Sequence, residues 1–250
     1  MSGIPIVIDL TTLAMPETTS YAPQQADALT VDDISFSYPN GHRVFTSFSL
    51  NAKPGEFVAI LGPSGCGKTT LLNLLSGFQQ PQSGQISINQ TAVCPERSEL
   101  GYVFQAPQLF PWLSTLENVR FGLRMTARLS EEQQRAQALQ YLRLVGLEGA
   151  AQRLPHQLSG GMQQRVSLAR TLALEPSVLL MDEPFAALDA ISRNSMNEET
   201  LRIWAELGQT VLFITHDIDE AVFLADRVIV LNIAPGGIQA MLGSGGEADS

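Results

Sequence analysis

The sequence predicts an α/β protein with a mainly parallel sheet, and three observations lead to this prediction. Apolar runs without any polar side chain occur late in the chain, at residues 178–181, 211–214 and 228–231. Strands buried on both faces of a sheet require such runs. Stretches of helical period separate them, and this alternation builds a parallel sheet. An earlier apolar run, residues 57–61, leads into a glycine-rich loop and then a helix-like segment.

An antiparallel layer is expected before and after this loop. Residues 29–38 and 44–50 alternate apolar and polar side chains, and Pro39-Asn40-Gly41 between them is a turn signal. Alternation on both sides of a turn indicates a half-buried hairpin. Residues 85–88 add a further short strand.

A helical insert is expected in the middle of the chain. The strand at residues 100–104 ends at Gln105, and the period is helical from about residue 115 to residue 173. Ser130 and Gln133 form a capping box, and Gly146 ends the helix that they open. We therefore place a helical subdomain at about residues 106–165. Further helices are expected at residues 189–207 and 218–225.

The composition limits the class of protein. The net charge of −10 argues against a broad nucleic-acid-binding face, and no apolar run approaches the ~18 residues of a membrane span. Two cysteines do not suggest a disulfide framework, which favours the cytosol. The first residues lack the cationic start of a secretory signal.

Both ends of the chain are expected to lie outside the folded domain, residues 28–242. We predict a poorly ordered extension at residues 1–27, where residues 6–8 are apolar enough to form an edge strand but need not do so. Residues 243–250 are rich in glycine, serine and acidic side chains and predict a flexible tail.

The glycine-rich loop has the pattern of a phosphate-binding loop. Its residues are Gly62, Pro63, Ser64, Gly65, Cys66, Gly67, Lys68, Thr69 and Thr70. Glycines let successive N–H groups point at phosphate oxygens, and the helix that follows adds its positive end. Lys68 can reach the β and γ phosphates, and the Thr69 hydroxyl can bind Mg²⁺. The sequence therefore predicts a nucleoside triphosphate site.

Polar residues at the ends of two later strands fit catalysis. Asp182 can hold Mg²⁺, directly or through water, because ligands of α/β sheets lie at the carboxyl ends of strands. Glu183 can accept a proton from the water that attacks the γ-phosphate. His216, after another strand, can orient that water, although a lone histidine there is more often a surface or capping residue.

A second helix start also favours an anion. Ser159 is a good N-cap, and Gly160 and Gly161 permit close backbone approach. An ordinary capped helix has the same pattern. Because one active site needs only one phosphate cradle, this second one can serve the nucleotide of another subunit.

Taken together, these motifs resemble the ATP-binding subunit of ABC transporters over about residues 28–242. The resemblance implies a P-loop ATPase core, an antiparallel β subdomain and an inserted helical subdomain. It also implies that Tyr38 stacks on adenine, although a core aromatic remains the alternative, and that Gln105 contacts Mg²⁺ and the attacking water. Two copies, or this chain and a paralogous ATPase, would bind two ATP molecules head to tail, each held by one phosphate loop and by the partner's Ser159–Gly161 segment.

The dimer seam and the branch of the family also follow from the resemblance. Residues 186–189 would cross the dimer seam, with Ala186 where the family more often has serine. Residues 153–157 resemble importer subunits in general. Residues 74–78, 182–190, 216–225 and the ending at 231–236 are similar to the nitrate, sulfonate and taurine importers. A peripheral place on the cytoplasmic face of the inner membrane is then expected, with membrane permease subunits and, through them, a periplasmic solute-binding protein as partners.

Three alternatives stay open at this point. The chain could power an importer of another solute, act as a soluble ATPase on DNA or the ribosome, or sense nucleotide without hydrolysis. The acidic charge disfavours the nucleic-acid alternative, and the intact Glu183 disfavours the sensor.

Overall fold

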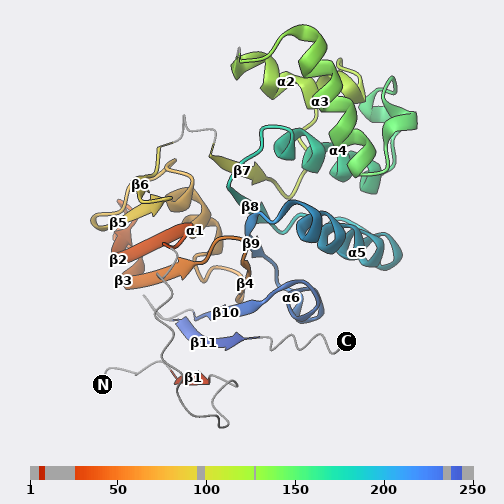
Figure 1. Cartoon of the computed structure of the whole chain (residues 1–250). Coiled ribbons are helices and arrows are strands. Elements are labelled where there is room, and N and C mark those ends of the chain that lie inside the picture. The colour runs from red at the N-terminus through yellow and green to blue at the C-terminus, as the bar shows by residue number, and fades with distance from the viewer. Residues whose placement is uncertain (1–5, 9–25, 95–98, 127, 233–237, 244–250) are drawn as a thin grey trace, which may run out of the picture. The chain divides into compact units, whose positions relative to one another are not determined.

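The computed structural model describes residues 6–8, 26–94, 99–126, 128–232 and 238–243, and these fall into two compact units. The first unit combines the described residues of Met1–Arg97 and Thr210–Ser250, and the second is Ser98–Gln209. Figure 1 shows the helices and strands of each unit. We describe each unit by itself.

The main sheet of the first unit contains strands from both ends of the chain. Its order is β1 (Ile6–Ile8), β11 (Ile238–Gly243), β10 (Arg227–Leu231), β4 (Phe57–Leu61) and β9 (Thr210–Ile214). The last three strands are parallel neighbours, which confirms the parallel core predicted from their apolar runs. Every residue of β4 and β9 is buried, as strands covered on both faces require.

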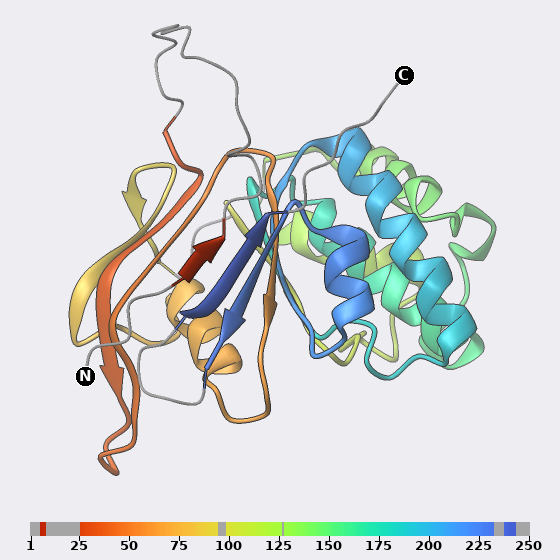
Figure 2. The ribbon, with the colours of Figure 1, turned by 90° about the horizontal axis from the view of Figure 1, so that it is seen from below.

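The structure answers the question left open at the N-terminus. Residues 6–8 do form an edge strand, β1, which pairs in parallel with β11, while β11 runs antiparallel to β10. Figure 2 shows the two blue strands β10 and β11 side by side. The rest of the expected extension, residues 1–5 and 9–25, lies outside the described residues. So does the expected tail, except Gly243, which ends β11.

The second sheet of this unit confirms the predicted antiparallel layer. Its order is β3 (Arg43–Ala52), β2 (Leu29–Ser37), β5 (Ser83–Ile88) and β6 (Thr91–Ala92), and all neighbours are antiparallel. Two short helices, α1 (Lys68–Leu75) and α6 (Ile218–Leu224), complete the unit.

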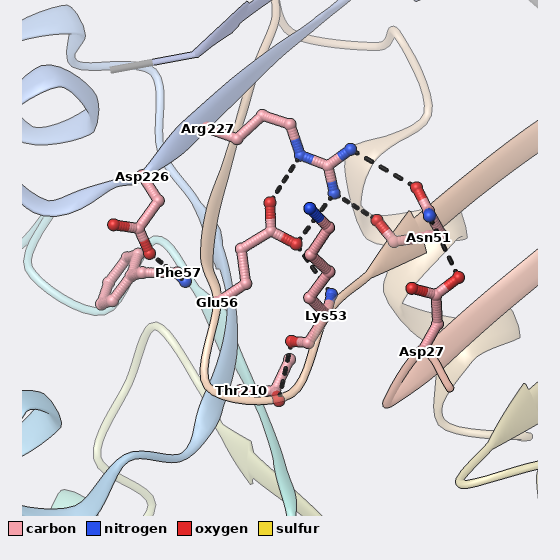
Figure 3. Close-up of polar contacts among 8 residues, drawn as sticks. All are labelled: Asp27, Asn51, Lys53, Glu56, Phe57, Thr210, Asp226 and Arg227. Atoms are coloured by element: carbon pink, nitrogen blue, oxygen red, sulfur yellow. Dashed lines mark hydrogen bonds and ion pairs between the residues drawn. The ribbon is translucent and has the colours of Figure 1, made fainter. Parts of the chain in front are cut away.

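A polar network ties the turn between β3 and β4 to the start of β10. Arg227 Nε lies 2.8 Å from Glu56 Oε1, and the same guanidinium donates to the backbone carbonyl of Asn51. The Phe57 N–H donates to Asp226 Oδ2 over 2.9 Å, and the Gly55 N–H donates to the Thr210 hydroxyl, also over 2.9 Å. Figure 3 shows the contacts of Arg227 with Glu56 and Asn51 and of Asp226 with Phe57, which join segments far apart in the sequence. The network fixes the end of β3 relative to β4 and β10.

The second unit combines two parallel strands with helices. The strands are β7 (Leu100–Val103) and β8 (Val178–Asp182). The longer helices are α2 (Thr115–Thr126), α3 (Glu131–Leu144), α4 (Gly160–Leu172) and α5 (Ala190–Leu207). Two 3₁₀ turns, Glu148–Ala150 and Pro155–Gln157, lie between α3 and α4.

The local signals that predicted helix ends are confirmed. Ser130 and Gln133 form the expected capping box of α3, and Gly146 adopts a left-handed φ of 68° just after that helix. Asp189, expected as the first residue of the helix over residues 189–207, is instead the N-cap of α5, and Gly208 ends that helix with a φ of 65°. Capping residues decide helix ends locally, which is why these predictions needed no tertiary information.

Residues 108–113, a mostly apolar segment shortly after Gln105, are divided between the interior and solvent. The Phe110 ring packs on Phe121, with centroids 4.4 Å apart, whereas Trp112 remains 72% exposed. Asn118, fully buried, accepts from the Phe110 N–H over 2.8 Å and donates to the Leu113 carbonyl over 3.0 Å. In the part of the chain that the structure describes, no helix is long and apolar enough to cross a membrane.

Candidate functional site

The phosphate loop lies between β4 and α1, in the geometry that its glycines allow. Gly65 and Gly67 have φ values of 82° and 103°, which other residues rarely adopt. A Cβ atom on Gly67 would lie 2.6 Å from Val44 Cγ1. The loop thus needs glycine at position 67 both for its conformation and for its close approach to β3.

The start of α1 is arranged to receive an anion. Its N-cap is Gly67, which offers no side chain to the N–H groups of the first turn. The Lys68 ammonium group donates to the carbonyls of Gly62 over 2.7 Å and Pro63 over 3.2 Å, so it lies across the loop. Thr69 is exposed at this helix start. Open N–H groups and a nearby cation are what a phosphate chain binds.

Tyr38 lies beside this loop. Its hydroxyl is 2.9 Å from the Thr70 hydroxyl, and its ring meets Phe36 edge to face, with centroids 5.2 Å apart. The tyrosine is half-buried, so part of its side chain is accessible from solvent.

His216 follows β9, the parallel neighbour of β4. The register pairs Ile60 with Ile214, so the phosphate loop and His216 follow adjacent strand ends. His216 is exposed. The residues on either side of it are fixed by hydrogen bonds, since the Thr215 hydroxyl donates to buried Glu220 over 2.5 Å and Asp217 caps α6. The first unit therefore brings together the loop, Tyr38 and His216.

The second unit collects the acidic residues. Asp182 is the last residue of β8, and its Oδ2 accepts a hydrogen bond from the Tyr102 hydroxyl over 3.4 Å. Burial, together with the Asp182 charge, raises the pKa of Tyr102 well above its usual range, so this hydroxyl stays protonated. Glu183, half-buried, has a left-handed φ of 41°. Such strain in a residue other than glycine is often found at functional sites.

Gln105 lies exposed just after β7, the parallel neighbour of β8. Two side chains of α4 hold the segment around it. Gln164, 2% exposed, donates to the Phe104 carbonyl over 3.2 Å. Arg170 donates to the carbonyls of Pro107 over 3.1 Å and Gln108 over 2.9 Å.

Ser159 caps α4 as predicted, accepting from the Met162 N–H over 3.3 Å. The two glycines that follow have ordinary helical surroundings. A Cβ on Gly160 would meet only Leu188, at 3.8 Å, and one on Gly161 would meet no described atom within 4 Å. Packing within this chain therefore does not require glycine at either position, which leaves a bare backbone surface at the start of α4.

Sequence reasoning missed Tyr102, Gln164 and Arg170. A tyrosine in an otherwise apolar strand was the only signal for Tyr102, and the two α4 residues look like ordinary polar positions of a helix.

The possible metal ligands carry oxygen atoms. Among the described residues there is no cluster of three histidine, cysteine, aspartate or glutamate side chains. The Thr69 hydroxyl, the Asp182 carboxylate and the Gln105 amide are instead the hard oxygen donors that suit Mg²⁺ bound together with phosphates. The donor chemistry thus fits the expected metal.

The fold and the two sets of residues define an ATPase of the P-loop class. The model of the ABC transporter family matches residues 45–186, more than half of the chain, and the chain belongs to this family. The expected fold class and the ATP-hydrolysing activity are thereby confirmed.

The relatives are ATP-binding proteins of transport systems. A taurine import ATP-binding protein, TauB, from Yersinia pestis bv. Antiqua (strain Antiqua) is 49% identical over 196 residues, which cover 78% of this chain and 76% of that protein. The bicarbonate transport ATP-binding protein CmpD of Synechocystis sp. (strain ATCC 27184 / PCC 6803 / Kazusa) is 42% identical over 226 residues, 89% of this chain and 80% of that protein.

Two solved structures share the fold. CbiO1 from Clostridium perfringens, part of the ABC transporter complex cbiONQ, has a TM-score of 0.77 and 32% identity, covering 86% of this chain and 87% of that one. The ATP-binding cassette MJ0796, in a dimeric post-hydrolysis state bound to ADP and phosphate, has a TM-score of 0.74 and 34% identity, covering 86% and 98%.

Proposed function

We propose that this chain is the ATP-hydrolysing subunit of a membrane importer for a small anion such as taurine, another alkanesulfonate or nitrate. The observation that carries the ATPase function is a pair of helix starts suited to the phosphates of ATP. One is the start of α1, with its glycine cap, and the other is the start of α4, with its two glycines. The names of the relatives, for taurine import and bicarbonate transport, support an anionic solute. We infer a single ATPase domain at about residues 28–242, with a helical subdomain at about 106–165.

The residues of the phosphate loop would bind the triphosphate. Its backbone N–H groups contact the phosphate oxygens, Lys68 compensates the β and γ charges, and Tyr38 stacks on adenine. In hydrolysis, water attacks the γ-phosphorus and the bond to the bridging oxygen of ADP breaks. Glu183 accepts the proton of that water, and His216 and Gln105 orient it.

Thr69, Asp182 and Gln105 would hold Mg²⁺, directly or through water. Bound Mg²⁺ supplies positive charge that offsets the charge developing on the β- and γ-phosphate oxygens.

We further propose that ATP joins two ATPase subunits head to tail. Ser159, Gly160 and Gly161 would contact the γ-phosphate of ATP bound to a second copy or to a paralogous ATPase. The backbone surface without side chains at the start of α4 supports a head-to-tail dimer. Glycine there lets the phosphate of an ATP bound to the other subunit approach the backbone. The dimeric cassette MJ0796 is a structural precedent at 34% identity.

Closure of the dimer would drive membrane permease subunits on the cytoplasmic face of the inner membrane. These subunits would in turn receive the solute from a periplasmic binding protein. Trp112, 72% exposed in the segment that follows Gln105, is where we expect this protein contact.

Transport in reconstituted vesicles tests this function. The chain is assembled with candidate permease subunits and a solute-binding protein, and uptake of labelled taurine and labelled nitrate is measured with ATP on the side of the ATPase. ATP-dependent uptake of one anion is expected, and it should be lost with Lys68→Ala. Co-purification with nucleic acid instead of membrane subunits would contradict the proposal.

A further inference from the structure

Tyr102 and Asp182 lie on neighbouring strands of the second unit. The parallel pairing of β7 with β8 sets Tyr102 opposite Leu180. Side chains two residues apart in a strand point to the same face, so Asp182 lies diagonally across from Tyr102 on that face. The Tyr102 hydroxyl donates to Asp182 Oδ2 over 3.4 Å.

The tyrosine is itself held in place. Its ring stacks on Phe104, with centroids 4.2 Å apart and an interplanar angle of 27°. Its backbone carbonyl accepts from the Thr171 hydroxyl of α4 over 3.3 Å. A hydrogen-bond donor can orient a carboxylate only if the donor itself has few conformations. The ring stacking and the backbone hydrogen bond of Tyr102 meet this condition.

We propose that Tyr102 is a positioning residue that orients the Asp182 carboxylate for Mg²⁺ bound with ATP. The proposal rests on the function proposed above, in which Asp182 serves the metal. A hydrogen bond to one carboxylate oxygen restricts rotation of the group and so favours one direction of the other oxygen. Hydrogen-bonded partners of a metal ligand commonly change metal affinity in this way.

The chain contains a matched control in the same unit. The Tyr141 hydroxyl of α3 donates to Glu175 Oε1 over 3.3 Å, a bond of the same chemistry and nearly the same length. Glu175 has no role in the proposed site. Tyr102→Phe and Tyr141→Phe each keep the ring and remove only the hydroxyl, so their comparison separates positioning of Asp182 from a general loss of a hydrogen bond.

The test uses the full chain and two readouts. The first is the Mg²⁺ concentration that gives half-maximal ATP hydrolysis. The second, independent of turnover, is binding of Mn²⁺ in the presence of ATP, followed by electron paramagnetic resonance. For Tyr102→Phe we expect the half-maximal Mg²⁺ concentration and the dissociation constant of Mn²⁺ each to rise by about three- to tenfold, less than the usual effect of about 10- to 100-fold because the bond is long. The kcat at saturating Mg²⁺ should stay within about twofold, and Tyr141→Phe should match the parent.

The proposal would be overturned if Tyr102→Phe bound the metal as tightly as the parent and Tyr141→Phe do. It would also be overturned if kcat fell while the metal affinity stayed unchanged. A double variant keeps the test decisive if Tyr102→Phe weakens the fold. In the Asp182→Asn background, adding Tyr102→Phe should change Mn²⁺ affinity by much less than it does alone; an undiminished change would overturn the idea. If the rate of ATP hydrolysis by the parent did not depend on Mg²⁺ concentration, the proposed function itself would be contradicted. That outcome differs from unchanged metal affinity in Tyr102→Phe, so the two failures can be told apart.

Discussion

Arg227 and Glu56 form an ion pair of 2.8 Å between residues 171 positions apart in the sequence. Their side chains are only 21% and 14% exposed, so water screens the pair less than it would a surface pair. The pair joins the start of β10 to the turn before β4, the strand that leads into the phosphate loop.

Replacing Arg227 by methionine should therefore lower the free energy of unfolding by about 2 kcal/mol, because Glu56 and the Asn51 carbonyl each lose a donor. Urea unfolding measures this change. A double variant with Glu56→Gln should lose about 1 kcal/mol less than the sum of the single variants. Strict additivity would show that the pair contributes no coupling.

Glu183→Gln should abolish turnover while ATP binding remains. The amide keeps the size of the side chain but cannot accept the proton of water, so we expect kcat to fall by about 100-fold or more. Phosphate release measures the rate, and size-exclusion chromatography with ATP should show a trapped dimer. Hydrolysis at the parental rate would assign the base to another residue.

Lys68→Ala should weaken ATP binding by about 10- to 100-fold, since a charge-assisted contact to phosphate is lost. Equilibrium binding of a fluorescent ATP analogue measures the effect. Lys53 is the only other lysine of the chain and is exposed on the turn before β4, so Lys53→Ala is the matched control. Equal losses in the two variants would argue against a specific role for Lys68.

Two substitutions of Tyr38 distinguish a stacking role of its ring from a hydrogen-bonding role of its hydroxyl. If its ring stacks on adenine, Tyr38→Ala should lower ATP affinity by about tenfold, whereas Tyr38→Phe should lower it by less than about twofold. The bond to Thr70 would then matter little for binding. If Tyr38 is instead a core aromatic, Tyr38→Ala will reduce the unfolding temperature without changing ATP affinity.

Stability at high pH should depend on Tyr141. Burial, and then the charge and hydrogen bond of Glu175, raise the pKa of Tyr141 from 10.0 to about 12. Because the folded state holds this proton more tightly, the stabilisation is full below pH 10 and is lost as the pH rises through 12. The unfolding temperature should fall over this range, and it should fall less in Tyr141→Phe. Absorbance of tyrosinate near 295 nm follows the titration.

Local patterns in the sequence were sufficient for the strands, the helix ends and the phosphate loop. The apolar run of β4 and the glycines after it were enough to predict a strand followed by a tight glycine-rich turn. The same holds for the caps at Ser130 and Ser159. Such features need no knowledge of distant segments.

Partners of polar side chains, in contrast, were decided by the tertiary structure. The register of β7 with β8 places Tyr102 near Asp182, and the pairing of β1 with β11 joins residues that no local pattern relates. Gln164 and Arg170 reach the segment around Gln105 only because α4 packs there. The sequence by itself thus determined which residues have the chemistry of an ATPase. Strand register and helix packing decided which side chains hold those residues in place, because hydrogen bonds form between groups that only the fold brings within reach.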